Sequence, residues 1–325
     1  MQTKLVRFYQ PGGPEVLKLD TAELGSPGPG EALIRHVAIG LNYMDVYHRS
    51  GAYPLPLPSA CGGEAAGIVE AVGAGVSGVA PGDRVVYAGG APGAYAERRL
   101  FPAARLVRIP DGVSDEIAAA VLLKGMTVEY LLNRCVHPAP GSLALMYAAA
   151  GGVGLLAGQW ARAMGVKLIG VVSGADKAAL AREAGYFAVI DRSREDVLAR
   201  VKELSGGAGV PIVYDSVGKA TYETSLKSLS PRGYFVSFGT TTGTPPPVEA
   251  ATLQKLGSLY FTRPTLVTYT ASCEDLAASA AAVFERVKSG VLKPHVGRRY
   301  ALADIVQAHA DLEGGRTAGS SIIVP

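Results

Sequence analysis

Residues 143–164 read LALMYAAAGGVGLLAGQWARAM, and this stretch decides the fold class. An apolar run at residues 143–148 is followed by two glycines, and an apolar run with helical character begins at Val153. A strand, a tight glycine turn and a helix in this order predict one βα unit of a parallel sheet.

The same alternation continues to about residue 266, which predicts a doubly wound parallel sheet joined by crossover helices. The other predicted strands are residues 168–172, 188–190, 212–215 and 234–239, and the predicted helices are residues 153–164, 175–184, 195–204 and 222–229.

One segment within this region imitates a membrane span. The stretch from Ser142 to Ala161 carries no charge and reaches the length of a span, about 20 residues. The glycine turn at Gly151 and Gly152 lies in its middle, and we therefore predict a buried βα unit and no membrane association.

The two ends of the chain have a different pattern. Short strand signals separated by Gly and Pro predict a mainly β region, at residues 4–8, 32–39, 67–72, 84–87, 94–100 and 106–109. After Pro264 come a predicted helix at 273–289, a strand at 296–300, a helix at 303–313 and a strand at 321–324. We expect this tail to complete the first domain, so that residues 1–124 and 267–325 form one domain and residues 125–266 the other.

Composition excludes some partners. Lys and Arg number 31 against 28 Asp and Glu, and a net charge of +3 gives no basic field of the kind that binds nucleic acid. The three cysteines, Cys61, Cys135 and Cys273, lie too far apart in sequence for a disulfide framework or a zinc knot. The first residues contain no apolar core of a secretory signal, and a reducing cytoplasm is the expected compartment.

The turn after the first parallel strand predicts a dinucleotide site. Small residues at Ala150, Gly151, Gly152 and Val153 allow the backbone to approach a pyrophosphate, and the following helix offers unpaired N–H groups to the phosphates. Ala149 stands where the usual fingerprint has its first glycine. The alternative is a tight turn that serves packing alone.

The end of the second parallel strand bears on the choice between NAD and NADP. An acidic residue about 20 positions after the fingerprint would bind the ribose 2′-hydroxyl of NAD, but no acid is found there. Ser173, Gly174 and Lys177 follow that strand, and Arg192 follows the next one. A hydroxyl and two cations favour the 2′-phosphate of NADP, the alternative being that both cations are ordinary surface charges.

Three further motifs carry a family resemblance. GGEAAG at residues 62–67, VEAVG at 69–73 and PGDRV at 81–85 resemble the catalytic domain of medium-chain dehydrogenases/reductases. AAGGVG at 149–154, with Gln159 and Arg162, resembles the branch of NADPH:quinone reductases and ζ-crystallins. The resemblance implies a GroES-like, mainly β catalytic domain beside a Rossmann cofactor domain, hydride transfer from NADPH to quinones, and a homodimer formed near residues 258–262.

The resemblance also implies chemistry without zinc. Zinc alcohol dehydrogenases have a cysteine ligand where this chain has Asn42 and a histidine ligand where it has Gly63. No Cys or His near residues 122–127 replaces the third ligand, and the five histidines are scattered, so we expect surface or capping histidines and no metal site. A quinone or conjugated enone carries its own electron sink and needs no Lewis acid.

Candidate site residues follow by match to the family. Asn42, Tyr47 and Tyr53 are the predicted catalytic residues, as hydrogen-bond donors to a carbonyl oxygen; the alternative for each tyrosine is packing at the boundary between the domains. Lys124 is interpreted as a hinge lysine. The predicted cofactor contacts are Asn42, Asp45, Tyr47, Thr127, Ala150, Gly151, Gly152, Val153, Ser173, Gly174, Lys177, Arg192, Val217, Gly218, Phe238, Gly239, Phe261, Arg263 and Arg316.

Two other functions remain open from the sequence. An NADPH-dependent alkenal or enone reductase would use the same cofactor and deliver hydride to a carbon–carbon double bond. A cofactor-binding protein with little catalysis, as in lens ζ-crystallins, is the alternative from a different class.

Overall fold

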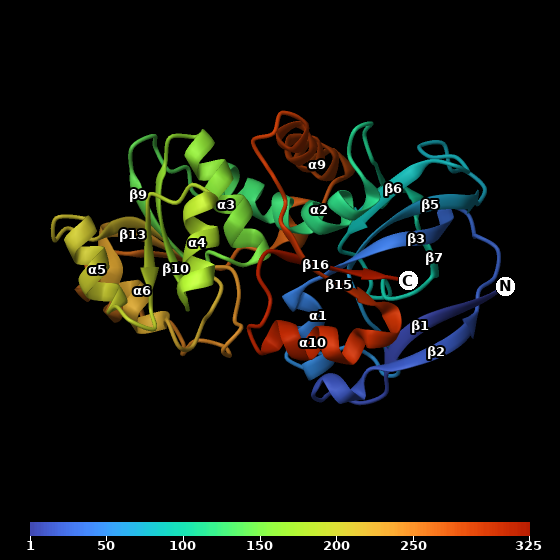
Figure 1. The fold of residues 1–325 in the computed structure, drawn as a ribbon, viewed down its shortest axis with the longest axis horizontal. Helices are drawn as coiled ribbons and strands as arrows, with labels where there is room; N and C mark the ends of the chain where they lie inside the picture. The colour runs from blue at the N-terminus through green and yellow to red at the C-terminus, as the bar shows by residue number, and fades with distance from the viewer. The chain divides into compact units, whose positions relative to one another are not determined.

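The computed structural model describes residues 1–325 and divides the chain into two compact units (Figure 1). Unit 1 contains Met1–Met126, Thr270–Ser289 and Pro294–Pro325, and unit 2 contains Thr127–Tyr269 and Gly290–Lys293. The short second piece of unit 2 is absent from the sequence prediction. It belongs there because Gln159 accepts a hydrogen bond from the Lys293 backbone N–H at 2.7 Å and donates one to the Lys293 carbonyl at 3.2 Å.

Unit 2 contains a six-stranded parallel sheet in the order β11-β10-β9-β12-β13-β14. The chain enters at the centre of the sheet, runs to one edge and then returns to build the other half, which is the doubly wound arrangement. The strands are β9 (Leu143–Tyr147), β10 (Lys167–Val172), β11 (Ala188–Asp191), β12 (Val210–Asp215), β13 (Leu229–Ser237) and β14 (Tyr260–Thr262). A Rossmann sheet of this kind is what the apolar alternation predicted.

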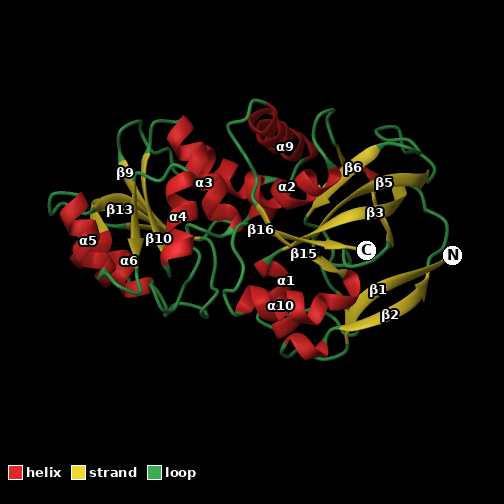
Figure 2. Cartoon of the chain, viewed as in Figure 1, coloured by secondary structure: helices red, strands yellow, loops and turns green.

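Two pairs of helices flank this sheet, and each pair packs together: α3 with α4, and α5 with α6 (Figure 2). The helices of unit 2 are α3 (Gly152–Ala163), α4 (Ala175–Glu183), α5 (Val197–Leu204), α6 (Tyr222–Ser228), α7 (Ala250–Lys255) and α8 (Leu266–Tyr269), with a π-helical turn at Leu131–Cys135. Apolar side chains of the strands, such as Leu145, Ile169 and Phe235, form the core beneath α5 and α6. The uncharged stretch that resembles a span is therefore β9 followed by α3, and no helix of the protein combines the length and apolar character needed to cross a bilayer.

Unit 1 is mainly β. A three-stranded antiparallel sheet contains β1 (Gln2–Phe8), β2 (Lys18–Glu23) and β4 (Ser59–Ala60). A seven-stranded sheet contains β3 (Glu31–Leu41), β5 (Glu64–Val72), β6 (Arg84–Ala88), β7 (Arg98–Pro102), β8 (Val107–Arg108), β15 (Val296–Ala301) and β16 (Ser320–Val324). The C-terminal strand β16 pairs with β3, so the tail completes this unit.

The helices of unit 1 lie around these sheets. They are α1 (Tyr43–Ser50), α2 (Asp115–Tyr130), which continues into unit 2, α9 (Cys273–Lys288) and α10 (Ile305–Glu313). Short 3-10 turns occur at Pro14–Val16, Ala103–Arg105 and Leu302–Asp304.

Several parts of unit 1 differ from the sequence prediction. Strand β7 covers Arg98–Pro102 and not residues 94–100, and strands β2 and β4 and helices α1 and α2 were not predicted at all. Helix α1 escapes the usual pattern because its inward face carries Asp45 and Arg49, which are 0% and 1% exposed. Polar side chains on a buried face remove the apolar periodicity from which helices are predicted.

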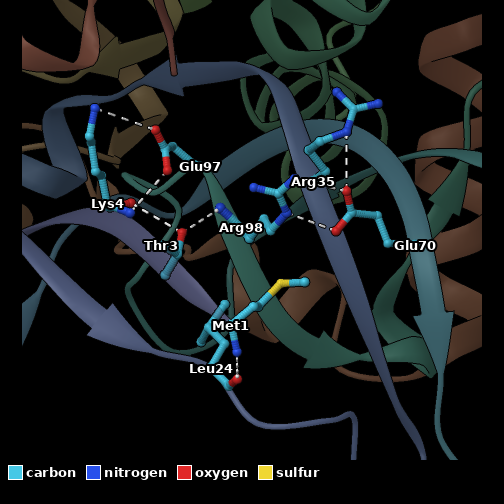
Figure 3. A network of polar contacts seen from close by, with 8 residues as sticks. All are labelled: Met1, Thr3, Lys4, Leu24, Arg35, Glu70, Glu97 and Arg98. Carbon is cyan, nitrogen blue, oxygen red and sulfur yellow. Dashed lines mark hydrogen bonds and ion pairs between the residues drawn. The ribbon is translucent and has the colours of Figure 1, made fainter.

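A network of polar contacts fixes the register of the first strands (Figure 3). The Arg98 backbone N–H donates to Thr3 at 3.0 Å, and the Lys4 backbone N–H donates to Glu97 at 3.1 Å. Glu70 on β5 accepts from Arg98 at 2.8 Å and pairs with Arg35 at 3.2 Å. These partly exposed pairs each contribute at most about 1 kcal/mol, so their effect is to align β1, β3, β5 and β7.

Candidate active site

The turn between β9 and α3 has the backbone geometry of a phosphate site. Helix α3 begins at Gly152 with extended backbone at Gly151, and the first intrahelical bond runs from Leu155 N–H to the Gly151 carbonyl at 2.9 Å. The preceding N–H groups therefore point out of the helix toward an incoming anion. A Cβ on Gly154 would lie 2.6 Å from the carbonyl of Ala149, so only glycine allows this close approach of helix and strand. The turn fits a dinucleotide pyrophosphate.

The ends of β10 and β11 place the four residues predicted for the 2′-phosphate on neighbouring segments. The Arg192 backbone N–H donates to the Val172 carbonyl at 3.0 Å, which sets Arg192 beside the end of β10. Its side chain is exposed and makes no ion pair within the chain. Ser173 is exposed, and Lys177 lies half-buried in the first turn of α4. Both cations belong to the segments that follow adjacent strands, which suits a phosphate group.

Asp191 organises this turn, a role that sequence reasoning missed. One carboxylate oxygen accepts from Gly174 N–H at 2.9 Å, from Ser193 N–H at 3.1 Å and from the Ser193 hydroxyl at 2.7 Å. The bond from Gly174, followed by those from Ser193, lowers the pKa of Asp191. Gly174 has φ 99°, a conformation that glycine adopts without strain. An acid at a strand end with a serine two positions later, Asp191 and Ser193, is the signal that could have revealed it.

Asp215 has the corresponding role at the end of β12. Its carboxylate is fully buried and accepts from the N–H groups of Val217 and Gly218 at 2.7 and 3.0 Å. It also accepts from the hydroxyls of Thr221 and Ser225 at 2.7 and 2.6 Å. The loop predicted to lie near the nicotinamide ribose is therefore held by one carboxylate that the sequence analysis did not single out.

Other predicted cofactor residues gather at the same strand ends. The Phe238 N–H donates to the Asp215 carbonyl at 2.8 Å, and a Cβ on Gly239 would lie 2.5 Å from the Ser216 carbonyl. Arg263 donates to the Ser237 carbonyl at 2.8 Å. Carboxyl ends of parallel strands at a change of strand order are where α/β sheets bind ligands.

Two further predicted cofactor residues are packed against the protein. Phe261 lies on β14 and packs edge-on against Phe235, with the ring centroids 5.4 Å apart. Thr127 is buried in α2. The structure gives both a packed position and leaves their contact with cofactor a prediction.

In unit 1, helix α1 and the loop after it hold the predicted catalytic tyrosines together. The Tyr47 and Tyr53 rings are 5.1 Å apart, and the Tyr53 N–H donates to the Tyr47 carbonyl at 3.0 Å. Tyr53 is 36% exposed and Tyr47 is 8% exposed, so the Tyr53 ring is the more accessible of the two. A catalytic role for the two hydroxyls stays a prediction.

Asn42 differs from its predicted role as a hydrogen-bond donor to substrate. Its amide Nδ2 donates to Glu64 at 2.8 Å and lies 3.4 Å from the Gly40 carbonyl, so both amide hydrogens face protein acceptors. The acceptor, Glu64, is 22 positions away in sequence, so sequence reasoning did not reveal this contact, and a contact of Asn42 with substrate or cofactor stays a prediction. Glu64 is buried, accepts from Leu123 N–H at 2.7 Å, and pairs with Lys124 at 3.6 Å. Lys124 thus balances a buried carboxylate, which the interpretation as a hinge did not include.

Asp45 and Arg316 also have protein partners that the sequence did not reveal. Asp45 is 0% exposed and accepts from the Asn42 N–H and the Tyr95 hydroxyl. Arg316 donates to Asp311 at 2.8 Å, and this bond is the main cause that lowers the pKa of Asp311 to about 2. Contacts of Asp45 and Arg316 with a cofactor therefore remain predictions.

Two histidines contradict the expectation of surface or capping positions. His36 is 4% exposed, bonded to the Ala96 carbonyl at 2.7 Å and to Tyr87 at 3.0 Å, and burial lowers its pKa to about 4. His309 is 0% exposed and bonded to Tyr95 at 3.1 Å. Both rings bind partners far away in sequence, which local spacing does not reveal, and His309 Nδ1 is buried without a hydrogen-bond partner. No three His, Cys, Asp or Glu side chains come close enough together to ligate a metal ion.

Comparison with known proteins gives matches over the whole chain. Residues 28–111 match the family model described as alcohol dehydrogenase GroES-like domain, and residues 152–284 match that described as zinc-binding dehydrogenase. The chain is 48% identical to a quinone oxidoreductase of Pseudomonas aeruginosa, with 99% of each chain covered. It is 39% identical to a 2-haloacrylate reductase of Burkholderia sp., with 98% of each covered. The crystal structure of Escherichia coli quinone oxidoreductase complexed with NADPH is similar with a TM-score of 0.97 and 45% identity, over 99% of this chain and 100% of that one.

Proposed function

Because the chain belongs to the quinone oxidoreductase family of medium-chain dehydrogenases/reductases, we propose that it transfers hydride from NADPH to quinones. The observation that carries the proposal is the cofactor turn. It combines a close helix–strand approach at Gly154 with two cations, Lys177 and Arg192, on the segments that follow β10 and β11. A relative of 45% identity was crystallised with NADPH, which supports the same cofactor for this chain.

Bound NADPH supplies the hydride, and the residues of this chain bind and orient the reactants. The N–H groups at the start of α3 face the pyrophosphate, and Ser173, Lys177 and Arg192 recognise the 2′-phosphate. Asp215 holds Val217 and Gly218 in the conformation that receives the nicotinamide ribose. Tyr53, with Tyr47 packed behind it, orients the acceptor ring or its carbonyl oxygen.

The proposed reaction needs no metal. Asn42 lies at a ligand position of the zinc enzymes, but its amide donates a hydrogen bond to Glu64. Gly63, at another ligand position, has no side chain. Zinc catalysis requires three protein ligands, which this donor set does not provide. A quinone accepts hydride into its own conjugated system, so positioning is sufficient.

A second candidate is reduction of an electron-poor carbon–carbon double bond. The observation in its favour is the 39% identity to a 2-haloacrylate reductase over nearly the full length of both chains. The same cofactor turn serves both reactions, and the two differ only in the acceptor.

We also propose that the protein forms a homodimer and works in a reducing cytoplasm. Strand β14 is the edge of the parallel sheet and pairs only with β13, so it leaves unpaired backbone groups for a second copy. Tyr260 on this strand is 53% exposed and stacks on Tyr234 at 4.6 Å, which offers an apolar surface beside the edge. The three cysteines are all free, as a reducing compartment would keep them.

The test is loss of NADPH absorbance in the presence of 1,4-benzoquinone, a short enal and 2-chloroacrylate. We expect turnover with the quinone and a preference for NADPH over NADH. Efficient reduction of the enal or the haloacrylate with negligible quinone turnover would replace the first candidate by the second. NADPH binding without turnover on any acceptor would favour the catalytically quiet protein.

A further inference from the structure

Asp191 lies beside the end of β10, although it belongs to β11. In the parallel register of these two strands, Asp191 pairs with Val172, the last residue of β10. Enzymes that bind NAD use an acid at the end of this second strand to accept the ribose 2′-hydroxyl. In this chain, the acid lies one strand away from that position and directly precedes Arg192.

The carboxylate of Asp191 already has donors within the chain. Its Oδ1 accepts from the Gly174 N–H at 2.9 Å, from the Ser193 N–H at 3.1 Å and from the Ser193 hydroxyl at 2.7 Å. A carboxylate oxygen offers about two lone pairs, so three donors saturate Oδ1. The bond from Gly174, and after it those from Ser193, lower the pKa of Asp191, which keeps the group ionised at neutral pH.

These bonds join the two segments that carry the predicted phosphate ligands. Gly174 directly precedes helix α4, whose first turn contains Lys177, and Ser193 directly follows Arg192. Gly174 and Ser193 donate to the same oxygen of Asp191, so the two backbones are held at one spacing. One phosphate can bind Lys177 and Arg192 together only if that spacing is maintained.

We propose that Asp191 is a positioning residue that determines the preference for NADPH, because it holds the segments of Lys177 and Arg192 at the spacing that one 2′-phosphate requires. This inference rests on the proposed function. NADH has no 2′-phosphate, so its binding does not depend on that spacing. Asp191 acts through an acceptor oxygen and not through its charge, so an uncharged acceptor of the same shape is sufficient.

The first test removes the acceptor and then restores it without the charge. Asp191→Ala should fold, because Ser193 is exposed and Gly174 half-buried, and water can replace the carboxylate there. With 1,4-benzoquinone as acceptor, we expect the KM for NADPH to rise about tenfold, and kcat and the KM for NADH to stay within about twofold. Asp191→Asn should return the KM for NADPH to within about threefold of wild type.

Asp196→Ala is the matched control. Asp196 is exposed and accepts from the Ala199 N–H at 2.7 Å, so this change removes a bond of the same kind from a neighbouring segment. It should leave the constants for both cofactors unchanged. Three results would overturn the proposal: an equal rise of KM for both cofactors in Asp191→Ala, a rise for NADH alone, which would mean that Asp191 contacts the ribose itself, or an Asp191→Asn variant as weak as Asp191→Ala.

A second variant keeps the proposal testable if Asp191→Ala does not fold. Ser193→Ala removes the hydroxyl donor and leaves the carboxylate in place. We expect the KM for NADPH to rise about threefold and the KM for NADH to stay unchanged. In that case, an unchanged KM for NADPH would overturn the proposal.

A double variant shows whether Asp191 acts through the cations. Asp191→Ala combined with Arg192→Ala should raise the KM for NADPH by less than the product of the two single increases, because both changes remove the same contact. Single increases that multiply in full would mean that Asp191 acts independently of Arg192, and would overturn the proposal.

Binding of cofactor fragments requires no turnover. Adenosine 2′,5′-bisphosphate carries the 2′-phosphate and AMP lacks it, and calorimetry measures the dissociation constant of each. Asp191→Ala should weaken the bisphosphate about tenfold and leave AMP within about twofold. Equal weakening of both would overturn the proposal. If wild-type protein oxidises no NADPH with quinones while the selective weakening is present, the proposed function fails and the role of Asp191 stands.

Discussion

Replacing Arg192 by Ala tests the cofactor assignment most directly. The Arg192 side chain is exposed beside the end of β10 and forms no ion pair with the rest of the chain, so its removal leaves no buried charge behind. Its expected partner is the 2′-phosphate, which NADPH carries and NADH lacks. The substitution should therefore weaken the binding of NADPH and leave the binding of NADH unchanged.

The magnitude follows from the type of contact. A hydrogen bond to a charged group contributes about 1.5–3 kcal/mol, and exposure to solvent puts Arg192 at the lower end of this range. Because about 1.4 kcal/mol corresponds to tenfold in affinity, we expect the KM for NADPH to rise about tenfold. We expect the kcat with NADPH, and both constants with NADH, to stay within about twofold. Added salt should weaken the binding of NADPH less in the variant than in the wild type.

The assay is initial-rate oxidation of each cofactor with 1,4-benzoquinone at several salt concentrations. Arg182→Ala is the control, because it removes the same charge from an exposed position at the far end of α4. An unchanged KM for NADPH, or an equal rise for NADPH and NADH, would refute the placement of the 2′-phosphate at Arg192. NADH as the better donor of the wild type would refute the cofactor assignment itself.

Four further outcomes are expected. Tyr53→Phe and Tyr47→Phe should each reduce kcat by about tenfold or less, whereas a loss of about a thousandfold would mean that the hydroxyl is an obligatory acid. Gly154→Ala should lower the free energy of unfolding by about 1–3 kcal/mol and abolish tight NADPH binding, since its Cβ would lie 2.6 Å from the Ala149 carbonyl. An unchanged melting temperature would contradict this. Asp215→Ala leaves the N–H groups of Val217 and Gly218 without their acceptor and should lower the free energy of unfolding, measured by chemical denaturation, by about 3–5 kcal/mol. Asp215→Asn retains an acceptor and should lower it by about 1–2 kcal/mol, and equal losses in the two variants would argue against the role of Asp215 as the acceptor of this loop. Burial lowers the pKa of His36 from 6.5 to about 4 in the folded state, so the unfolded chain binds the proton first and the free energy of unfolding falls as the pH drops from 6.5 to 4. His36→Gln should reduce the slope of the free energy of unfolding against pH in this window by about 1.4 kcal/mol per pH unit, and an unchanged slope would rule out His36 as its source.

The sequence by itself determined five of the six parallel strands and the helices between them, whereas the edge strand β14 was not predicted. Strand β9 and helix α3 begin within one residue of their predicted starts, and β10, α4 and β11 agree equally well. These elements are buried in a regular layered arrangement, so their apolar pattern is local and complete in the sequence. The phosphate turn could be predicted for the same reason, since its small residues are consecutive.

Unit 1 was less predictable because its stabilising contacts are not local. Strands β2 and β4 and helices α1 and α2 were missed, and β7 lies nearer the C-terminus than predicted. Helix α1 is held by the bond of Asp45 to Tyr95, 50 positions away, and by the contact of Arg49 with Glu313, 264 positions away. No window of sequence contains both partners of such contacts.

The chemical state of the site depended on the tertiary structure most of all. Residue types and family motifs indicated Asn42 and Asp45 as residues of the site. Only the fold shows that the Asn42 amide donates to Glu64 and faces the Gly40 carbonyl, and that Asp45 Oδ1 lies near Gly63 without a hydrogen-bond partner. Likewise, Asp191 and Asp215 are unremarkable acids in the sequence and become turn-organising acceptors only where strands end side by side. The physical reason is that hydrogen-bond direction and desolvation depend on neighbours in space, whereas apolar periodicity is written along the chain.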